Sequence, residues 1–253
     1  MASQQDLGYG ERRSGARGSM AKTLDRRFSG TMSFSSTVAV SAGLFALCCC
    51  SAEKDPPSAV GVLEGDLEPM ESALTYHTPA YHVNLRRALI DRAPRLCVLQ
   101  FLVMPAFEPE TLLSLHQVHG GYEVQVLTPK LQIWAFEGDA GNIECTESKK
   151  HLPEQTAERL RGVWNRMLLR TRHDASPHLV LDGVGYAFMG YERGPGHMSG
   201  ESRNPEQRTR PYVLADIGEA VVAYVRADSV SERAILAKVS KSLGELEASL
   251  ATK

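Results

Sequence analysis

Three residues in the second half of the chain have side chains suited to acid–base catalysis: His173, Asp182 and His197. A histidine base needs an orienting carboxylate and a nucleophile within hydrogen-bond reach, and no serine here stands in a nucleophile motif. The chain has no Gly-x-Ser-x-Gly, His-Glu-x-x-His or Gly-x-x-x-x-Gly-Lys-Ser/Thr sequence. We therefore expect a protein without enzymatic activity. A small exported hydrolase-like enzyme built on residues 173–197 is the alternative hypothesis.

A metal site is the second chemistry to consider, because His116 and His119 are three residues apart. If residues 110–119 form the short helix that their pattern suggests, the two imidazoles share one face. Two imidazoles alone make a poor site, and the spacing assigns no third ligand. We expect neither a metal ion nor a cofactor.

The segment 192–211 is polar and rich in glycine and proline, which predicts a long surface loop. Long loops in compact domains are either functional or disordered. Arg193, His197 and Arg203 are therefore candidate binding residues for an unidentified protein or envelope ligand; a solvated loop without function is the alternative. Binding to nucleic acid is not expected, because 28 Lys and Arg residues against 30 Asp and Glu give a formal net charge of −2.

The N-terminal segment carries a targeting pattern. A basic region precedes the short apolar run 37–47, and small residues follow that run. This order is typical of a secretory signal. Met20 and Met32 are alternative starts, and Met20 fits better because a start at Met32 would remove every basic residue of the segment.

The cysteines after the apolar run resemble the lipidation site of a bacterial lipoprotein. Leu47 stands three residues before Cys50, with two further cysteines in place of the usual small residues. We expect lipidation at Cys50, and hence a protein anchored by lipid in the cell envelope, on the periplasmic face of a bacterial membrane. Cleavage after Ala52, which would release a secreted protein, is one alternative. A cytoplasmic protein in which 37–50 forms a buried helix is another.

Two cysteines remain after such a signal, Cys97 and Cys145. In an oxidising compartment an even pair is a disulfide candidate. Two separate buried thiols are the alternative, because Cys97 lies in a strongly apolar run.

The remaining patterns define the elements that must position these residues. We expect a signal segment over 1–52, a flexible linker over 53–72 and one α+β domain over 73–253, with an antiparallel-rich sheet packed by about three helices. Hydrophobic periodicity predicts the following elements: a buried strand over 96–104, hairpins over 122–136 and 178–188, a helix after Pro153, and helices over 213–225 and 235–250.

Overall fold

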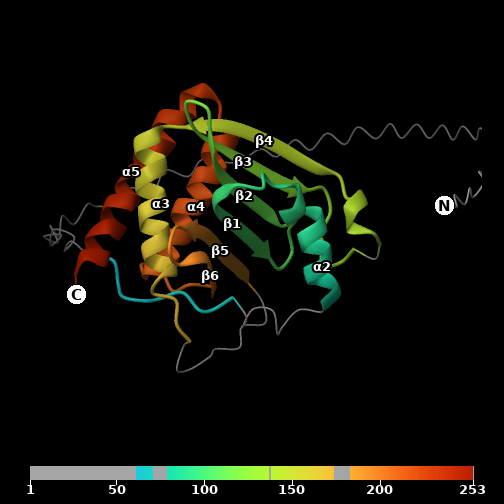
Figure 1. Ribbon diagram of the computed structural model, residues 1–253, viewed down its shortest axis with the longest axis horizontal. Helices are drawn as coiled ribbons and strands as arrows, with labels where there is room; N and C mark the ends of the chain where they lie inside the picture. Colours follow the sequence, from blue (N-terminus) through green and yellow to red (C-terminus); the bar gives the residue numbers. More distant parts are fainter. Residues whose placement is uncertain (1–60, 71–78, 137, 174–182, 253) are drawn as a thin grey trace, which may run out of the picture. The chain divides into compact units, whose positions relative to one another are not determined.

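The computed structural model describes residues 61–70, 79–136, 138–173 and 183–252, and its fold is α+β (Figure 1). The strands are β1 Cys97–Pro105, β2 Thr111–Val118, β3 Gly121–Pro129, β4 Cys145–Leu152, β5 Val184–Glu192 and β6 Gly196–Arg203. The helices are α2 Pro79–Ala88, α3 Glu154–Leu168, α4 Arg210–Arg226 and α5 Ser229–Ala251, with short turns η1 Ile90–Arg92 and η2 Ala140–Asn142.

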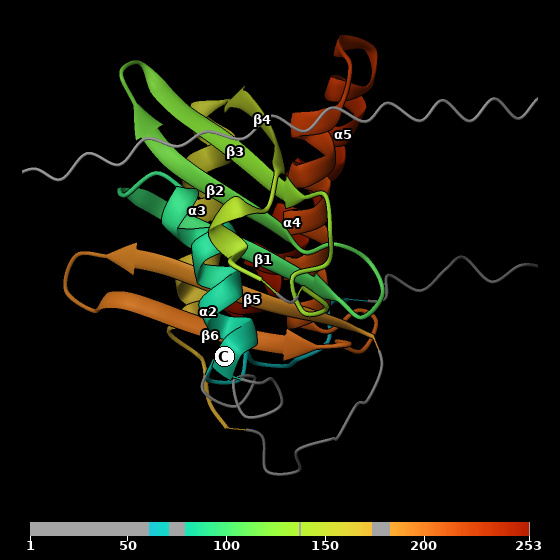
Figure 2. The ribbon, with the colours of Figure 1, turned by 90° about the vertical axis from the view of Figure 1, so that its right-hand side faces the viewer.

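The strands form one six-stranded sheet in the order β4-β3-β2-β1-β5-β6, and every neighbouring pair is antiparallel. The chain runs outward from β1 to the edge strand β4, then crosses through α3 and returns beside β1 as β5. Helices α3 and α4 cover one face of the sheet, α5 packs against these two helices on the same side, and α2 covers part of the other face (Figures 1 and 2). We call these the helical face and the α2 face.

The helical face is built around a cluster of aromatic rings. Trp164 of α3 packs against Phe101 of β1 and Phe188 of β5, with ring centroids 5.8 and 5.2 Å apart. Its indole N–H donates to the carbonyl of Met189 at 3.1 Å. Helix α4 lies very close to β1, because a Cβ atom on Gly218 would come within 2.5 Å of the Phe101 ring. This approach fixes the position of α4 over the sheet.

The α2 face has a smaller apolar cluster. Leu102 and Leu112, which alternate with the residues of the helical face, pack with Leu85 and Leu89. The α2 face also holds the buried carboxyl of Glu110.

Two predicted elements are wrong in type. Residues 110–119 contain strand β2 instead of a helix, because a central strand covered on both faces carries a continuous apolar run. The segment 131–136 is not a strand: Ile133 is buried there and its backbone N–H donates to Glu110 at 2.9 Å. The partner of β3 is the polar strand β4.

The long polar loop predicted over 192–211 is also wrong. Its residues 196–203 form strand β6, which pairs with β5 through a tight turn at 193–195. Gly194 and Gly196 adopt positive φ angles of 111° and 84°, which suit this turn. The strand over 96–104 and the helices after Pro153 and near the C-terminus are confirmed. The predicted hairpin over 178–188 lies partly outside the described residues.

The second half of the predicted flexible linker belongs to the domain. Leu67 is fully buried in the core of the helical face. Glu68 exchanges two backbone hydrogen bonds with Glu201 of β6, at 2.8 and 2.7 Å. Asp66 forms an ion pair with Arg172 at 2.7 Å. Residues 61–70 are therefore a docked segment, whereas 53–60 lie outside the described part of the chain.

Candidate functional site

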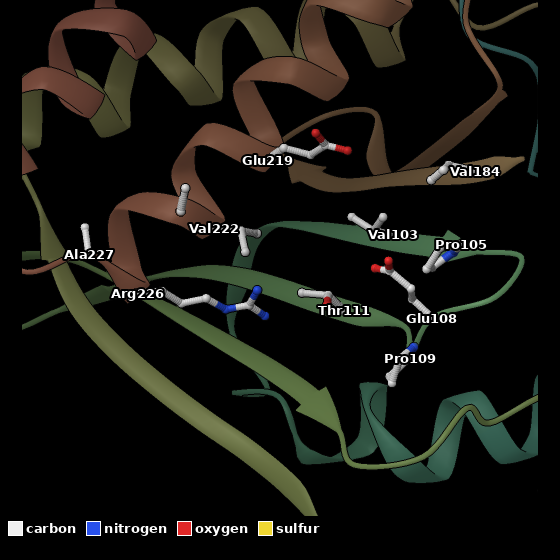
Figure 3. A pocket seen from close by; sticks show the side chains of 11 residues that line it. Val103, Pro105, Glu108, Pro109, Thr111, Val184, Glu219, Val222, Arg226 and Ala227 are labelled. Carbon is white, nitrogen blue, oxygen red and sulfur yellow. The ribbon is translucent and has the colours of Figure 1, made fainter. Parts of the chain in front are cut away.

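A pocket of about 550 Å³ opens between β1, β2 and the C-terminal half of α4 (Figure 3). Positions three and four apart on a helix share a face, so α4 presents Glu219, Val222 and Arg226 to the pocket together. Val103 of β1 and Val184 of β5 form much of the apolar wall. The other lining residues are Pro105, Glu108, Pro109, Thr111, Ala223 and Ala227.

Two carboxylates lie toward one end of this pocket: Glu219 from α4 and Glu108 from the loop after β1 (Figure 3). The hydroxyl of Tyr186 donates a hydrogen bond to Glu219 at 2.8 Å. Burial, together with this hydrogen bond and the charge of Glu219, raises the pKa of Tyr186, so the phenol stays neutral and remains a donor. Tyr186 stacks parallel to Phe101, which anchors the pair to the core.

Arg226 lies at the other end of the pocket (Figure 3). Its guanidinium donates to the hydroxyl of Thr128 at 2.6 Å, and that hydroxyl is 3.1 Å from the hydroxyl of Thr111. The positive charge is thus held on the β2–β3 side, while Glu219 lies toward β5 and Glu108 lies in the loop between β1 and β2. The pocket combines an apolar middle with charges of opposite sign at its ends.

A second hollow of about 310 Å³ adjoins this pocket and shares Val184 and Glu219 with it. It adds the rings of Tyr186 and Tyr212 and the carboxylate of Asp216. Asp216 accepts a hydrogen bond from Lys238 at 2.7 Å. The carboxylate end of the site is therefore both acidic and aromatic, a combination that attracts organic cations.

In the described part of the chain, the three catalytic candidates do not lie together. His173 is exposed at the end of the segment that follows α3, and Asp182 lies outside the described part. His197 lies on β6 with its ring 5.1 Å from that of Tyr191. No hydrogen bond joins His173 to His197 within the described ranges.

The candidate binding residues are also separated. Arg193 and His197 lie at the β5–β6 turn, whereas Arg203 is at the far end of β6, opposite Gly185. Six residues of strand, about 20 Å, separate His197 from Arg203. Cys50, the predicted lipidation site, lies outside the described residues.

Cys97 and Cys145 are free thiols in the structure. Cys97 donates to the carbonyl of Pro94 at 2.7 Å, and Cys145 lies 3.5 Å from the carbonyl of Ala88. They are on β1 and β4, which are three strand positions apart in the sheet. That lateral separation is about 14 Å, beyond the roughly 7 Å between Cα atoms that a disulfide tolerates. The predicted pairing is thus replaced by two separate thiols.

His116 and His119 are not on a helix, so the geometry proposed for their shared metal is absent. His116 lies on β2 with its Nε2 atom 3.2 Å from Glu123. His119 is in the turn after β2. In the part of the chain that the structure describes, no group of three His, Cys, Asp or Glu residues is arranged to hold a metal ion. No helix in that part is long and apolar enough to span a membrane.

The sequence interpretation missed Glu108, Glu219 and Arg226. One signal was present: Asp216, Glu219 and Arg226 are charged residues at steps of three and seven in a helix whose other charged residue is Arg210. Their meaning depends on the contact between α4 and β1, which are more than 100 residues apart in the chain.

Comparisons with known proteins found no matching family model, curated protein or solved structure.

Proposed function

We propose that this chain is an exported cell-envelope protein that binds a small amphipathic organic cation in the pocket beside α4, without catalysing a reaction on it. The observation that carries the binding role is an apolar wall that ends in two carboxylates, Glu108 and Glu219. The pocket volume of about 550 Å³ is in the range of small-molecule sites.

The polar end suits a protonated amine. An ammonium group near Glu219 gains a charge-assisted hydrogen bond, about twice as strong as a neutral one. The Tyr186 hydroxyl already donates to one lone pair of that carboxylate and so orients it. The remaining lone pairs can accept hydrogen bonds from the ammonium group. Tyr212 offers an aromatic surface beside the same carboxylate.

The rest of the pocket suits a hydrocarbon body. Val103, Val184 and Val222 exclude water from an alkyl chain, and burial of each methylene is worth about 0.8 kcal/mol. Arg226 at the far end disfavours a second positive charge. A monovalent cation with an alkyl or aryl tail therefore fits better than a polyamine.

Three probes of equal length test this assignment: heptylamine, heptanol and heptanoate, titrated into the full chain by calorimetry and by saturation-transfer NMR. We expect heptylamine to bind best and heptanoate worst. Glu219→Gln retains an acceptor for Tyr186 and should weaken heptylamine binding about tenfold, equivalent to about 1.4 kcal/mol. Glu245→Gln, at an exposed position of α5, is the matched control. Equal affinity for the three probes, or no effect of Glu219→Gln, would overturn the binding role.

Export is supported by the N-terminal segment alone, in which a basic region, an apolar run and Cys50 follow one another. Eleven Cα-to-Cα steps separate Cys50 from Gly61, where the docked segment begins. Fully extended, they reach at most about 40 Å. A lipid on Cys50 would keep the domain within that distance of the membrane surface.

Intact mass and membrane fractionation of the untagged chain, expressed in a Gram-negative host, test export separately from binding. A lipid-modified product starting at Cys50 in the membrane fraction is expected. Cys50→Ala should abolish the modification, whereas Cys48→Ala should not. A soluble product starting at Glu53 would replace the anchor with secretion, and an unprocessed chain would overturn export.

A further inference from the structure

Several large apolar side chains are exposed together at one end of the sheet. Ten such side chains are exposed in the described residues, and four of them are Leu63, Phe107, Leu131 and Trp134. Phe107 is in the loop from β1 to β2, and Leu131 and Trp134 are in the connection from β3 to β4. Leu63 lies against the segment that follows β6, because its backbone N–H donates to the carbonyl of Arg208 at 2.8 Å.

Strand register places these three connections at the same end. Strands β1, β3 and β6 finish there, and β2, β4 and β5 begin there (Figure 2). We call it the loop end. Neighbouring strands are about 4.8 Å apart, so the exposed apolar side chains form a row about 20 Å long across the sheet.

The local structure holds these side chains outward. Ile133, between Leu131 and Trp134, is buried, and its backbone N–H is held by Glu110 at 2.9 Å. Phe107 follows Pro105 by two residues and precedes Pro109 by two, and each proline fixes its own φ angle. Exposed apolar groups that gather in one place mark a surface that contacts a partner.

The path of the chain indicates what that partner is. The guanidinium of Arg208 donates to the carbonyl of Gly61 at 3.3 Å, so the chain enters the domain at the loop end. Eleven Cα-to-Cα steps, at most about 40 Å, separate Gly61 from Cys50. A lipid on Cys50, which is part of the proposed function, would therefore hold the loop end nearer to the membrane than the opposite end of the sheet.

We propose that the loop end is a membrane-contact surface, at which Phe107, Leu131, Trp134 and Leu63 insert into the interfacial region of a lipid bilayer. The amphipathic ring of tryptophan favours that region. The exposed acids Glu64 and Glu108 adjoin two of these residues, so apolar insertion, and not attraction to anionic lipids, supplies the binding.

The cation pocket lies beside this surface. Glu108 and Pro109, which directly follow Phe107, line the pocket. Amphipathic cations enter bilayers with the charged group at the surface and the apolar part below it. If the proposed cation binding holds, contact at the loop end brings the pocket to the place where its ligands gather.

Tryptophan fluorescence tests the contact directly. The chain has two tryptophans, and Trp164 is buried in the core, so a change in emission on membrane contact reports Trp134. The full chain, with serine at every other cysteine position, is coupled through Cys50 to a maleimide lipid in phosphatidylcholine vesicles. Attachment then does not depend on lipidation in the cell. We expect a blue shift of the emission and quenching by lipids brominated near the headgroup, and both should be lost in Trp134→Phe.

A probe moved to the opposite end of the sheet is the first control. In Trp134→Phe with Tyr191→Trp, the new indole lies next to the β5–β6 turn and should not be quenched. Leu131→Ser should lower the ratio of inserted to free loop ends about tenfold. Leu169→Ser is the matched control, because Leu169 has the same exposed fraction of 58% and follows α3. Unchanged Trp164 emission shows that each variant is folded.

A Trp134 that is not quenched on the vesicles, or equal quenching of the indoles at positions 134 and 191, would overturn the membrane contact. So would equal effects of Leu131→Ser and Leu169→Ser. These outcomes leave export undecided, because the mass of the chain expressed in a Gram-negative host tests lipidation at Cys50 separately.

Discussion

The two faces of the sheet bury different kinds of side chain. The helical face buries the larger apolar cluster, with rings of Phe101, Trp164 and Phe188 in contact beneath three helices. The α2 face buries fewer apolar residues beneath one short helix. It also carries polar side chains across the strands, including the contact between Gln125 and Glu147 at 2.8 Å.

The α2 face differs from the helical face also in that it buries two carboxyl groups. Glu110 and Glu201 are 1% and 3% exposed, and Glu110 accepts hydrogen bonds from Ile133 and Tyr81. Burying a carboxyl costs free energy unless the group is hydrogen-bonded or protonated. We infer that most of the stability resides on the helical face, whereas the α2 face responds to solution conditions.

The largest expected effect comes from two neighbours on β2 that point to opposite faces. Leu113 is buried under the helices and Leu112 under α2, each at most 1% exposed. Leu113→Ala should lower the free energy of unfolding by about 4 kcal/mol, and Leu112→Ala by about 2.5 kcal/mol. The loss is smaller for Leu112→Ala because one short helix can move to fill the cavity left by the side chain more easily than three packed helices can. Urea denaturation of both variants measures the difference, and equal losses would remove the distinction between the faces.

The next effect is a pH dependence that belongs to Glu201. Burial raises its pKa from 4.5 to about 8, with the charge of Glu68 acting in the same direction and that of Arg203 in the opposite one. Below about pH 4.5 the carboxyl is protonated in both the folded and unfolded chains. Between there and pH 8 only the unfolded chain loses the proton, so the stability contribution is progressively lost as pH rises.

We expect the free energy of unfolding to fall by about 2 kcal/mol from this group between pH 5 and pH 7, since the limit is about 1.4 kcal/mol per pH unit. Glu201→Gln should remove that slope, and the variant should be more stable than the parent chain at pH 8. Thermal denaturation across this pH range, with Glu245→Gln as an exposed control, measures it. A slope that survives in Glu201→Gln would assign the titration to another group.

The sequence predicts the elements of the helical face better than those at the sheet edges. Strand β1 and helices α3, α4 and α5 have apolar patterns that stand out in isolation. Strands β4 and β6 are mostly polar because edge strands expose one side and discourage pairing with other chains. These two segments are strands because they pair with β3 and β5, and their own residue patterns do not predict it.

The candidate cation site depends on contacts that no local pattern encodes. Glu219 is one polar residue of an amphipathic helix until α4 is placed over β1 and β5. Sequence spacing therefore directed attention to His116 and His119, which the fold does not use together.

A third measurement uses glycines to test how tightly the helical face is packed. Gly218→Ala would place a methyl group within 2.5 Å of the buried Phe101 ring, and overpacking of this kind costs about 1–3 kcal/mol. Gly162→Ala, on the exposed side of α3, meets nothing within 4 Å and should stabilise by about 0.5–1 kcal/mol. Opposite shifts in melting temperature are expected. A neutral Gly218→Ala would mean that α4 can move away from β1, and heptylamine binding should then change with it.

The smallest effect compares one ion pair from each face. Arg159 of α3 donates twice to Glu247 of α5, at 3.1 and 2.8 Å, and both side chains are about 70% buried. Glu247→Gln should cost about 1 kcal/mol, because two-point contacts between held side chains lose less entropy than exposed pairs do. On the α2 face, Arg86 and Asp91 meet at 3.2 Å but are more than half exposed, so the stability loss for Asp91→Asn should be below about 0.5 kcal/mol. Urea denaturation at low and high salt separates the two, because salt screens exposed pairs more than partly buried ones. Equal losses would show that α2 is held as firmly as α5, and the α2 face would then be no more adjustable than the helical face.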